Sequence, residues 1–123
     1  MFKGEELAKT LSELIKVNTS NPPGNETEVA KLLAEKLSEY GFSSLIIESE
    51  KNRGSLIVHV ENGEGPSLLL LSHLDVVPAK PEEWKVHPFS GEIKNGFVWG
   101  RGALDCKGTV VIELYTFLHL VEE

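Results

Sequence analysis

Two segments near the N-terminus have the hydrophobic spacing of amphipathic helices. In the first, apolar residues recur at intervals of three and four positions, at Leu7, Leu11, Leu14 and Ile15. This spacing places them on one face of a helix. The helix must end before Pro22, because proline lacks a backbone N–H and restricts the residue before it.

The second segment has clearer start and stop signals. Asn25 can act as an N-cap, and Glu28 three positions later completes a pattern that resembles a capping box. Gly41 is a natural residue to follow the helix C-terminus. The predicted buried face comprises Val29, Leu32, Leu33 and Leu37.

The pattern then changes to that of strands. Residues 42–50 and 55–60 are predicted strands joined by a turn at 51–54. Residues 67–72 (Ser-Leu-Leu-Leu-Leu-Ser) form a continuous apolar run bounded by turn signals, which is typical of a central strand covered on both faces. Asn95-Gly96 between short apolar runs predicts a β-hairpin within residues 92–99.

The last segment, residues 105–123, is apolar nearly all round and predicts a buried helix. Two helices, several strands and a covered helix together indicate a layered α/β fold. We expect a further part of the polypeptide or another chain to pack on this last helix, which leaves open a homodimer formed through it.

Composition narrows the class of protein. A length of 123 residues suits one domain, and a net charge of −7 with dispersed acidic residues argues against nucleic-acid and membrane partners. A single cysteine excludes a disulfide framework and suits a reducing compartment. The N-terminus lacks the apolar stretch of a signal peptide, and the longest apolar run has four residues. We therefore expect a cytoplasmic location.

The first candidate for chemistry is the pair His73 and Asp75, directly after the predicted central strand. Ligands of open α/β sheets bind beyond the carboxyl ends of strands. A neutral imidazole is a common zinc ligand, and its other ring nitrogen usually donates to a carboxylate. Residues i and i+2 of an extended chain share a face, so Asp75 can serve His73 in this way. The plainer alternative is a buried structural histidine followed by a turn aspartate.

The second candidate is the glycine-rich segment 100–108, which contains Asp105. Glycines permit tight turns and close backbone approach. Asp105 could be a metal-ligating carboxylate at a strand-to-helix junction, or simply the N-cap of the last helix. Phosphate binding is disfavoured, because the spacing matches neither a Walker loop nor a dinucleotide fingerprint and the aspartate would repel phosphate.

Together these segments resemble the M20 family of metallopeptidases and deacylases, which includes acetylornithine deacetylase, succinyl-diaminopimelate desuccinylase, aminoacylase and a glutamate-releasing carboxypeptidase. Order and spacing both agree over essentially the whole chain. The matching positions are Ser72-His73-Leu74-Asp75-Val76-Val77-Pro78, Trp84, Pro88-Phe89, Gly91, Asn95-Gly96, Gly100-Arg101-Gly102-Ala103, Asp105 and Lys107-Gly108.

The resemblance implies a three-layer α/β/α zinc-peptidase-like domain with a mixed central sheet, incomplete in this chain. It implies that His73 ligates one zinc ion, that Asp105 bridges two, and that Asp75 is the catalytic-site carboxylate that orients His73. Two ions in such a site polarise a scissile carbonyl and acidify a bridging water. Cobalt or manganese would also suit the N/O donors. The implied substrates are N-acyl amino acids or small peptides cleaved at an amide bond.

The family also has parts that this sequence lacks. Its general-base glutamate lies in a later Glu-Glu pair after a further strand, and its lid or dimerisation domain is an insertion. Glu122-Glu123 resembles that pair only superficially, because no strand separates it from Asp105. We therefore expect residues 1–123 to be the N-terminal segment of one catalytic domain, inactive alone. The alternative is a non-catalytic α/β module, from a truncated gene, that binds a metal or a partner.

The other candidates have plainer interpretations. Cys106 lies near a helix N-terminus, which can lower a thiol pKa, but without a second cysteine a small packing residue is the preferred interpretation. Lys107 is expected to be a surface charge at the start of the helix, and Arg101 matches the family pattern without an assigned role. Structural or solvated roles are expected for His59, His87, His119, Trp84 and Phe89.

Overall fold

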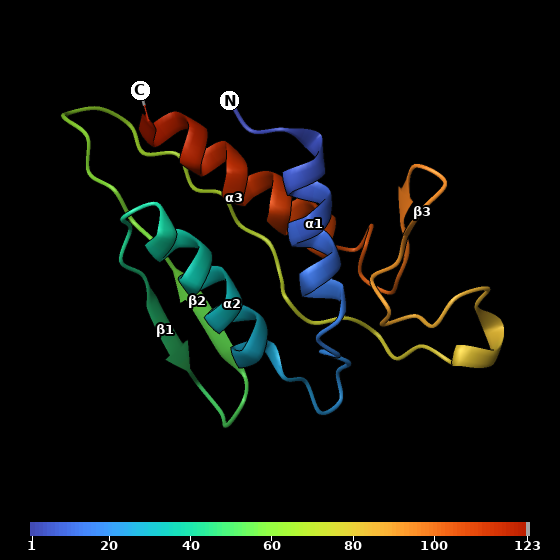
Figure 1. Ribbon diagram of the computed structural model, residues 1–123. Helices are drawn as coiled ribbons and strands as arrows, with labels where there is room; N and C mark the ends of the chain where they lie inside the picture. The colour runs from blue at the N-terminus through green and yellow to red at the C-terminus, as the bar shows by residue number, and fades with distance from the viewer. Residues whose placement is uncertain (123) are drawn as a thin grey trace.

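The computed structural model describes residues 1–122 of the chain. Its elements, shown in Figure 1, are α1 (Gly4–Ile15), α2 (Glu26–Glu39), β1 (Leu45–Glu48), β2 (Gly54–Ile57), the 3-10 turn η1 (Pro81–Glu83), β3 (Ile93–Lys94), β4 (Phe97–Val98) and α3 (Lys107–Glu122). The three predicted helices, the first two strands and the hairpin are therefore all confirmed, and the fold is of the α/β class.

The three helices share one apolar core. Leu14 of α1, Leu37 of α2 and Leu118 of α3 are all at most 1% exposed. The faces predicted from the 3.6-residue period are the faces that pack inward. Gly41 follows α2 with a φ of +87°, as expected for a residue after a helix C-terminus. Asn25 does occupy the N-cap position, but its side chain makes no capping hydrogen bond, so that part of the prediction is wrong.

Strands β1 and β2 form an antiparallel pair in which Leu45 lies opposite Ile57. The hydroxyl of Thr27 in α2 ties the helix to this pair, because it donates to the Glu48 carboxylate and accepts from the Gly54 N–H, each at 2.8 Å. Strands β3 and β4 close at Asn95-Gly96, where both residues have positive φ as a two-residue hairpin turn requires.

Residues 67–72 differ from the prediction. They are extended beside α3 (Figure 1), but they are not assigned as a strand and pair with no strand of residues 1–122. Leu68, Leu69 and Leu71 are 72%, 78% and 77% exposed. A central strand requires neighbouring strands at both edges and a cover on both faces, and no strand of residues 1–122 pairs with this segment. The predicted mixed central sheet is therefore absent from residues 1–122, which form two separate two-stranded antiparallel sheets.

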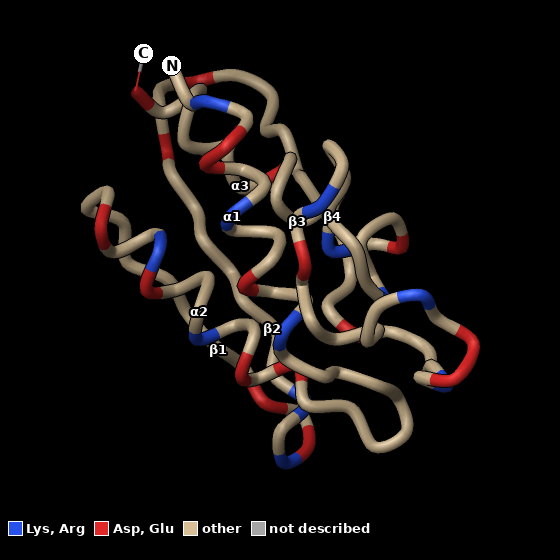
Figure 2. The backbone as a smooth tube through the Cα atoms, turned by 45° about the vertical axis from the view of Figure 1, so that its right-hand side comes forward, with Lys and Arg blue, Asp and Glu red and all other residues tan. Residues whose placement is uncertain are grey.

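Helix α3 is buried on one side only, which corrects the prediction of a helix covered all round. Its inner face, including Val111 and Leu114, packs in the core, whereas Ile112 and Leu120 are 61% and 50% exposed. Charged residues are scattered over the backbone tube in Figure 2 and include both signs. Among the described residues, no helix has the length and apolar character needed to cross a membrane.

A buried hydrogen bond joins the first and last helices. The hydroxyls of Thr10 in α1 and Tyr115 in α3 are 2.8 Å apart, and both residues are buried. We predict that Tyr115→Phe lowers the free energy of unfolding by about 1–3 kcal/mol, because the Thr10 hydroxyl then loses its partner. Chemical denaturation of the double variant Thr10→Val/Tyr115→Phe should show most of this loss recovered. A loss in the double variant equal to the sum of the single losses would contradict the assigned pairing.

Candidate metal centre

His73 lies on a segment that a neighbouring loop holds in place. The hydroxyl of Thr19 donates to the Leu74 carbonyl at 2.8 Å, and the Val76 N–H donates to the Thr19 carbonyl at 3.1 Å. The Asn21 N–H then donates to the Val76 carbonyl at 2.9 Å. The turn that ends α1 therefore fixes the backbone on which His73 and Asp75 stand.

The imidazole of His73 lies between two aspartates. Its Nδ1 is 3.0 Å from Oδ1 of Asp75, and its Nε2 is 3.1 Å from Oδ1 of Asp105. The other oxygen of Asp75 accepts a hydrogen bond from Nδ2 of Asn21 at 3.1 Å. The three residues singled out from the sequence are thus brought together, although Asp105 is 32 positions from His73 along the chain.

A glycine-rich bend delivers Asp105 to this position. Gly100 and Gly102 have φ values of +150° and +93°, which side chains rarely tolerate. The Lys107 N–H donates to the Gly102 carbonyl at 2.7 Å and closes the bend. Asp105 stands two residues ahead of α3, and its carboxylate bonds to His73. The N-cap alternative is therefore disfavoured.

Cys106 completes the cluster. Its thiol donates to the His73 carbonyl at 3.1 Å, and the ligand atoms of His73, Asp105 and Cys106 all lie within 4.8 Å of one another. Burial raises the pKa of the Cys106 thiol, and nearby acidic groups add to this effect. A lowered thiol pKa, the alternative considered from the sequence, is therefore wrong.

Opposing effects act on the protonation of His73. Burial lowers the pKa of the imidazole, but the carbonyl and carboxylate of Asp75 and the carboxylate of Asp105 outweigh it, and the pKa of His73 is raised. Each carboxylate favours a positively charged centre beside it. The electrostatics of the cluster therefore favour a cation, either a proton on the ring or a metal ion that replaces it.

The donor set fits a zinc-like ion. An imidazole nitrogen and a carboxylate oxygen are both ordinary zinc ligands, and Asp75 occupies the place of the carboxylate that orients a ligating histidine. Ligand bonds of about 2.0–2.2 Å at tetrahedral angles place two ligand atoms about 3.4 Å apart. The separation of 3.1 Å between His73 and Asp105 is close to that value.

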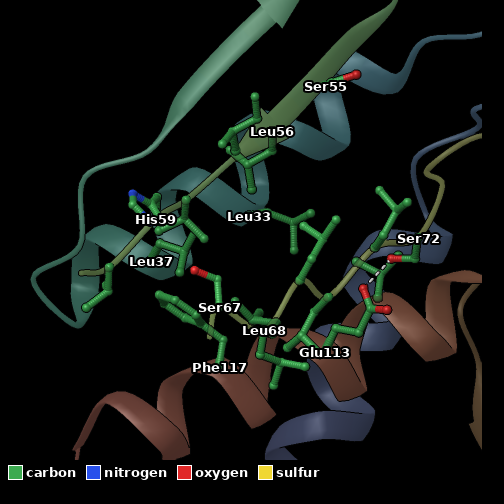
Figure 3. A pocket seen from close by; sticks show the side chains of 18 of the residues that line it. Leu33, Leu37, Ser55, Leu56, His59, Ser67, Leu68, Ser72, Glu113 and Phe117 are labelled. Carbon is green, nitrogen blue, oxygen red and sulfur yellow. Dashed lines mark hydrogen bonds between the residues drawn. The ribbon is translucent and has the colours of Figure 1, made fainter. Parts of the chain in front are cut away.

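Two hollows adjoin the cluster. A cavity of about 330 Å³ is bordered by His73, Asp75, Asp105, Trp84 and the glycine-rich bend. A much larger open groove, about 1800 Å³, runs between β2, residues 61–72, α2 and α3. Figure 3 shows Leu33, Leu56, Leu68 and Phe117 around it, and Ser72 donating to Glu113 at 2.6 Å. The groove reaches His73 at one end, but Asp105 borders the smaller cavity and not the groove, so we assign the site to the smaller cavity.

The structure also places the remaining candidates. His59 and His87 are exposed and His119 lies in α3, so His73 is the one histidine in the cluster. Lys107 is fully buried, not a surface charge: its ammonium donates to the Val17 carbonyl at 2.8 Å, and burial lowers its pKa to about 8. Glu122 is the last residue of α3, and Glu123 lies outside the described residues.

Two contributors to the site were not predicted from the sequence. Asn21 was interpreted only as part of a helix-ending turn, yet it bonds Asp75 from 54 positions away. Cys106 was interpreted as packing, yet its sulfur lies beside the metal-ligand candidates. The spacing of hydrophobic residues along the chain does not reveal contacts between residues so far apart in the sequence. The concentration of Asn, Thr and Ser in residues 18–21 was the one available signal.

Comparisons with known proteins show which proteins this chain resembles. The family model described as "Peptidase family M20/M25/M40" matches residues 69–123. A solved structure, the M20 family metallo-carboxypeptidase Sso-CP2 from Sulfolobus solfataricus, superposes with a TM-score of 0.83 and 32% sequence identity. The match covers 95% of this chain and 27% of that one. The chain therefore shares the α/β fold of part of a metallo-carboxypeptidase.

Curated relatives give the same result. A probable succinyl-diaminopimelate desuccinylase from Staphylococcus aureus is 30% identical over 99% of this chain and 30% of its own length. The N-fatty-acyl-amino acid synthase/hydrolase PM20D1 of Xenopus tropicalis is 36% identical over 87% of this chain and 22% of its own length. The chain is similar to proteins of the M20 family over nearly its whole length, and it spans less than a third of the length of these relatives.

The glycine-rich bend provides a test of how the site is positioned. A Cβ on Gly100 would overlap the Ile15 side chain and approach the Pro88 carbonyl to 2.9 Å. We predict that Gly100→Ala lowers the free energy of unfolding by about 1–3 kcal/mol and weakens zinc binding, because the bend that carries Asp105 must shift. Gly4→Ala is the matched control, since nothing lies within 4 Å of its added methyl group. Zinc affinity and stability in Gly100→Ala equal to those of the control would contradict this role.

Proposed function

We propose that residues 1–123 are the N-terminal segment of a single catalytic domain of a di-zinc amidohydrolase, without the lid or dimerisation domain. The observation that carries this proposal is the placement of His73 between Asp75 and Asp105, at 3.0 and 3.1 Å. A histidine ligand, its orienting carboxylate and a second ligand from another element together suit a hydrolytic metal site.

Each residue has a distinct task in this proposal. His73 offers Nε2 as a ligand, while Asp75 accepts a hydrogen bond from Nδ1–H and so fixes the tautomer and the ring orientation. Asn21 holds the second oxygen of Asp75. Asp105 has a largely exposed carboxylate with two oxygens, which suits a ligand that bridges two ions. Bound zinc ions would polarise the scissile carbonyl and lower the pKa of a water molecule.

The proposed substrate class is an N-acyl amino acid or a small peptide cleaved at its amide bond. The names of the relatives support this class, since they include a desuccinylase, an N-fatty-acyl-amino acid synthase/hydrolase and a metallo-carboxypeptidase. Cobalt or manganese would suit the same N/O donors. A cytoplasmic location is also part of the proposal and rests on the single cysteine.

A non-catalytic binding module is the second candidate. The leucine-lined groove favours it, because Leu68, Leu69 and Leu71 are exposed and could meet a partner, including a second copy through α3. The gene sequence after Glu123 separates the two candidates. A strand followed by a Glu-Glu pair, and then by a further acidic residue and a histidine, supports the enzyme, whereas a stop codon supports the module.

Zinc titration tests the ligand assignment. We predict weak zinc binding to the chain, because His73 and Asp105 cannot close a tetrahedral shell on their own and the Cys106 thiol is bonded to the His73 carbonyl. His73→Ala should abolish binding, and Asp75→Asn should weaken it about 10- to 100-fold, since an amide stabilises the imidazole less well than a carboxylate does. Isothermal titration calorimetry measures both effects.

The exposed His59 supplies the control for this titration, because it lies outside the cluster. His59→Ala should bind zinc as the parent chain does. Tight stoichiometric binding that survives His73→Ala would place the metal elsewhere and contradict the proposed site.

An activity assay tests the proposal that the segment is incomplete. The chain with zinc should not hydrolyse N-acetyl amino acids, because no carboxylate of the described residues stands beside the cluster as a free general base: Asp75 and Asp105 are both engaged by His73. Zinc-dependent turnover that is lost in His73→Ala would contradict this prediction. It would show that a group of this chain supplies the general base.

A further inference from the structure

Lys107, the first residue of α3, is fully buried and has no task in the account so far. Its ammonium donates to the Val17 carbonyl, which is 2.8 Å away and 90 positions earlier in the chain. No carboxylate of the described residues forms an ion pair with it. Burying an ammonium without an opposite charge is costly, and an apolar side chain of similar length would fill the space without that cost. The charge therefore needs an explanation beyond packing.

The acceptor, Val17, lies in the segment that positions His73. Two residues further on, Thr19 accepts from the Val76 N–H and donates to the Leu74 carbonyl. These two bonds hold the backbone on either side of the residue that orients His73. A hydrogen bond made to Val17 therefore acts on the same segment that fixes the imidazole.

The other end of Lys107 is joined to the bend that carries Asp105. The Lys107 N–H donates to the Gly102 carbonyl at 2.7 Å. A Cβ on Gly102 would lie 2.8 Å from Cγ1 of Val76 and 3.3 Å from Cδ of Lys107, so the missing side chain leaves room for both. The bend, the lysine stem and the residue after Asp75 thus pack against one another.

We propose that Lys107 is a positioning residue whose ammonium holds the segment behind His73 and the bend that carries Asp105 at the separation that a shared metal ion needs. The inference rests on the proposed function for the identity of the ion. The quantity that Lys107 maintains is the 3.1 Å between Nε2 of His73 and Oδ1 of Asp105. Lys107 itself touches neither the ion nor a substrate in this proposal.

A cap on α1 is the plainer alternative role for Lys107. Lysine side chains can bond the last carbonyls of a helix, where the negative end of the helix dipole favours a cation. Val17 lies just beyond the end of α1, and the last turn of α1 has no basic residue of its own. A cap would affect stability alone, whereas a positioning residue also governs how the bend meets His73.

The first test compares Lys107→Met with the parent chain, because methionine fills much of the same space and removes the ammonium. We expect the variant to fold, since the loss of a partner for the Val17 carbonyl is offset by the relief of a buried charge. Zinc affinity, measured by isothermal titration calorimetry, should fall about 10-fold or more, as for other groups that orient metal ligands. Lys36→Met, which removes the same charge from an ion pair with Glu13, is the matched control and should leave zinc affinity unchanged.

A second readout needs no metal. Cys106 is the single cysteine of the chain, and its thiol is bonded to the His73 carbonyl. With a chelator present, iodoacetamide should alkylate Cys106 about 10-fold faster in Lys107→Met than in the parent chain, because the bend is no longer held against His73. Loss of a nearby cation would by itself slow the reaction, since it disfavours the thiolate. A faster reaction therefore reports a change of position. Lys36→Met should react at the parent rate.

A folded Lys107→Met variant with unchanged zinc affinity or an unchanged alkylation rate would overturn the proposal. Lower stability with both readouts unchanged would identify Lys107 as a cap on α1. If Lys107→Met does not fold, Lys107→Gln takes its place, since it keeps a shorter amide donor, and it should show smaller changes in the same directions. Failure of both variants to fold would make the ammonium a requirement of the fold and would also overturn the proposal. Absence of zinc binding in the parent chain would contradict the metal centre, whereas the alkylation rate would still decide the role of Lys107.

Discussion

The position of His73 depends on a backbone clamp between two segments that are more than 50 residues apart in the sequence. Thr19 and Asn21 bond to the backbone at Leu74 and Val76, and the Asn21 amide also reaches Asp75. These groups lie in the segment between the end of α1 at Ile15 and Pro22. The end of the helix and the site geometry are therefore linked, since a longer α1 would remove the groups that hold the metal-ligand segment.

Much of the fold follows from local signals. The period of α1 and α2, the glycine after α2 and the Asn95-Gly96 hairpin depend on nearby residues, and the structure agrees with each of them. Residues 67–72 show the limit of such reasoning. A run of leucines predicts burial, but burial of a strand needs neighbouring strands, and residues 1–122 provide none beside it. The prediction assumed neighbouring strands that residues 1–122 do not contain.

Only the part of the site formed by residues close together in the sequence could be predicted from local signals. His73 and Asp75 are two positions apart, so their pairing is visible in the sequence, whereas their proximity to Asp105 was implied by resemblance to the M20 family. Asn21 and the burial of Lys107 were missed, because both depend on how the segment after α1 packs: Asn21 bonds to Asp75, and the Val17 carbonyl accepts from Lys107. Asn and Lys at such positions are ordinarily solvated, and only the tertiary structure shows otherwise.

The central claim is that Nε2 of His73 binds a metal ion while Nδ1 is bonded to Asp75. Anomalous diffraction at the zinc edge, from crystals of the chain grown with zinc, measures this directly. The account predicts a peak within bonding distance, about 2.0–2.2 Å, of His73 Nε2 and an Asp105 oxygen, with Asp75 still bonded to Nδ1. A peak on Nδ1, or one at His59 or His87 with none at His73, would contradict it.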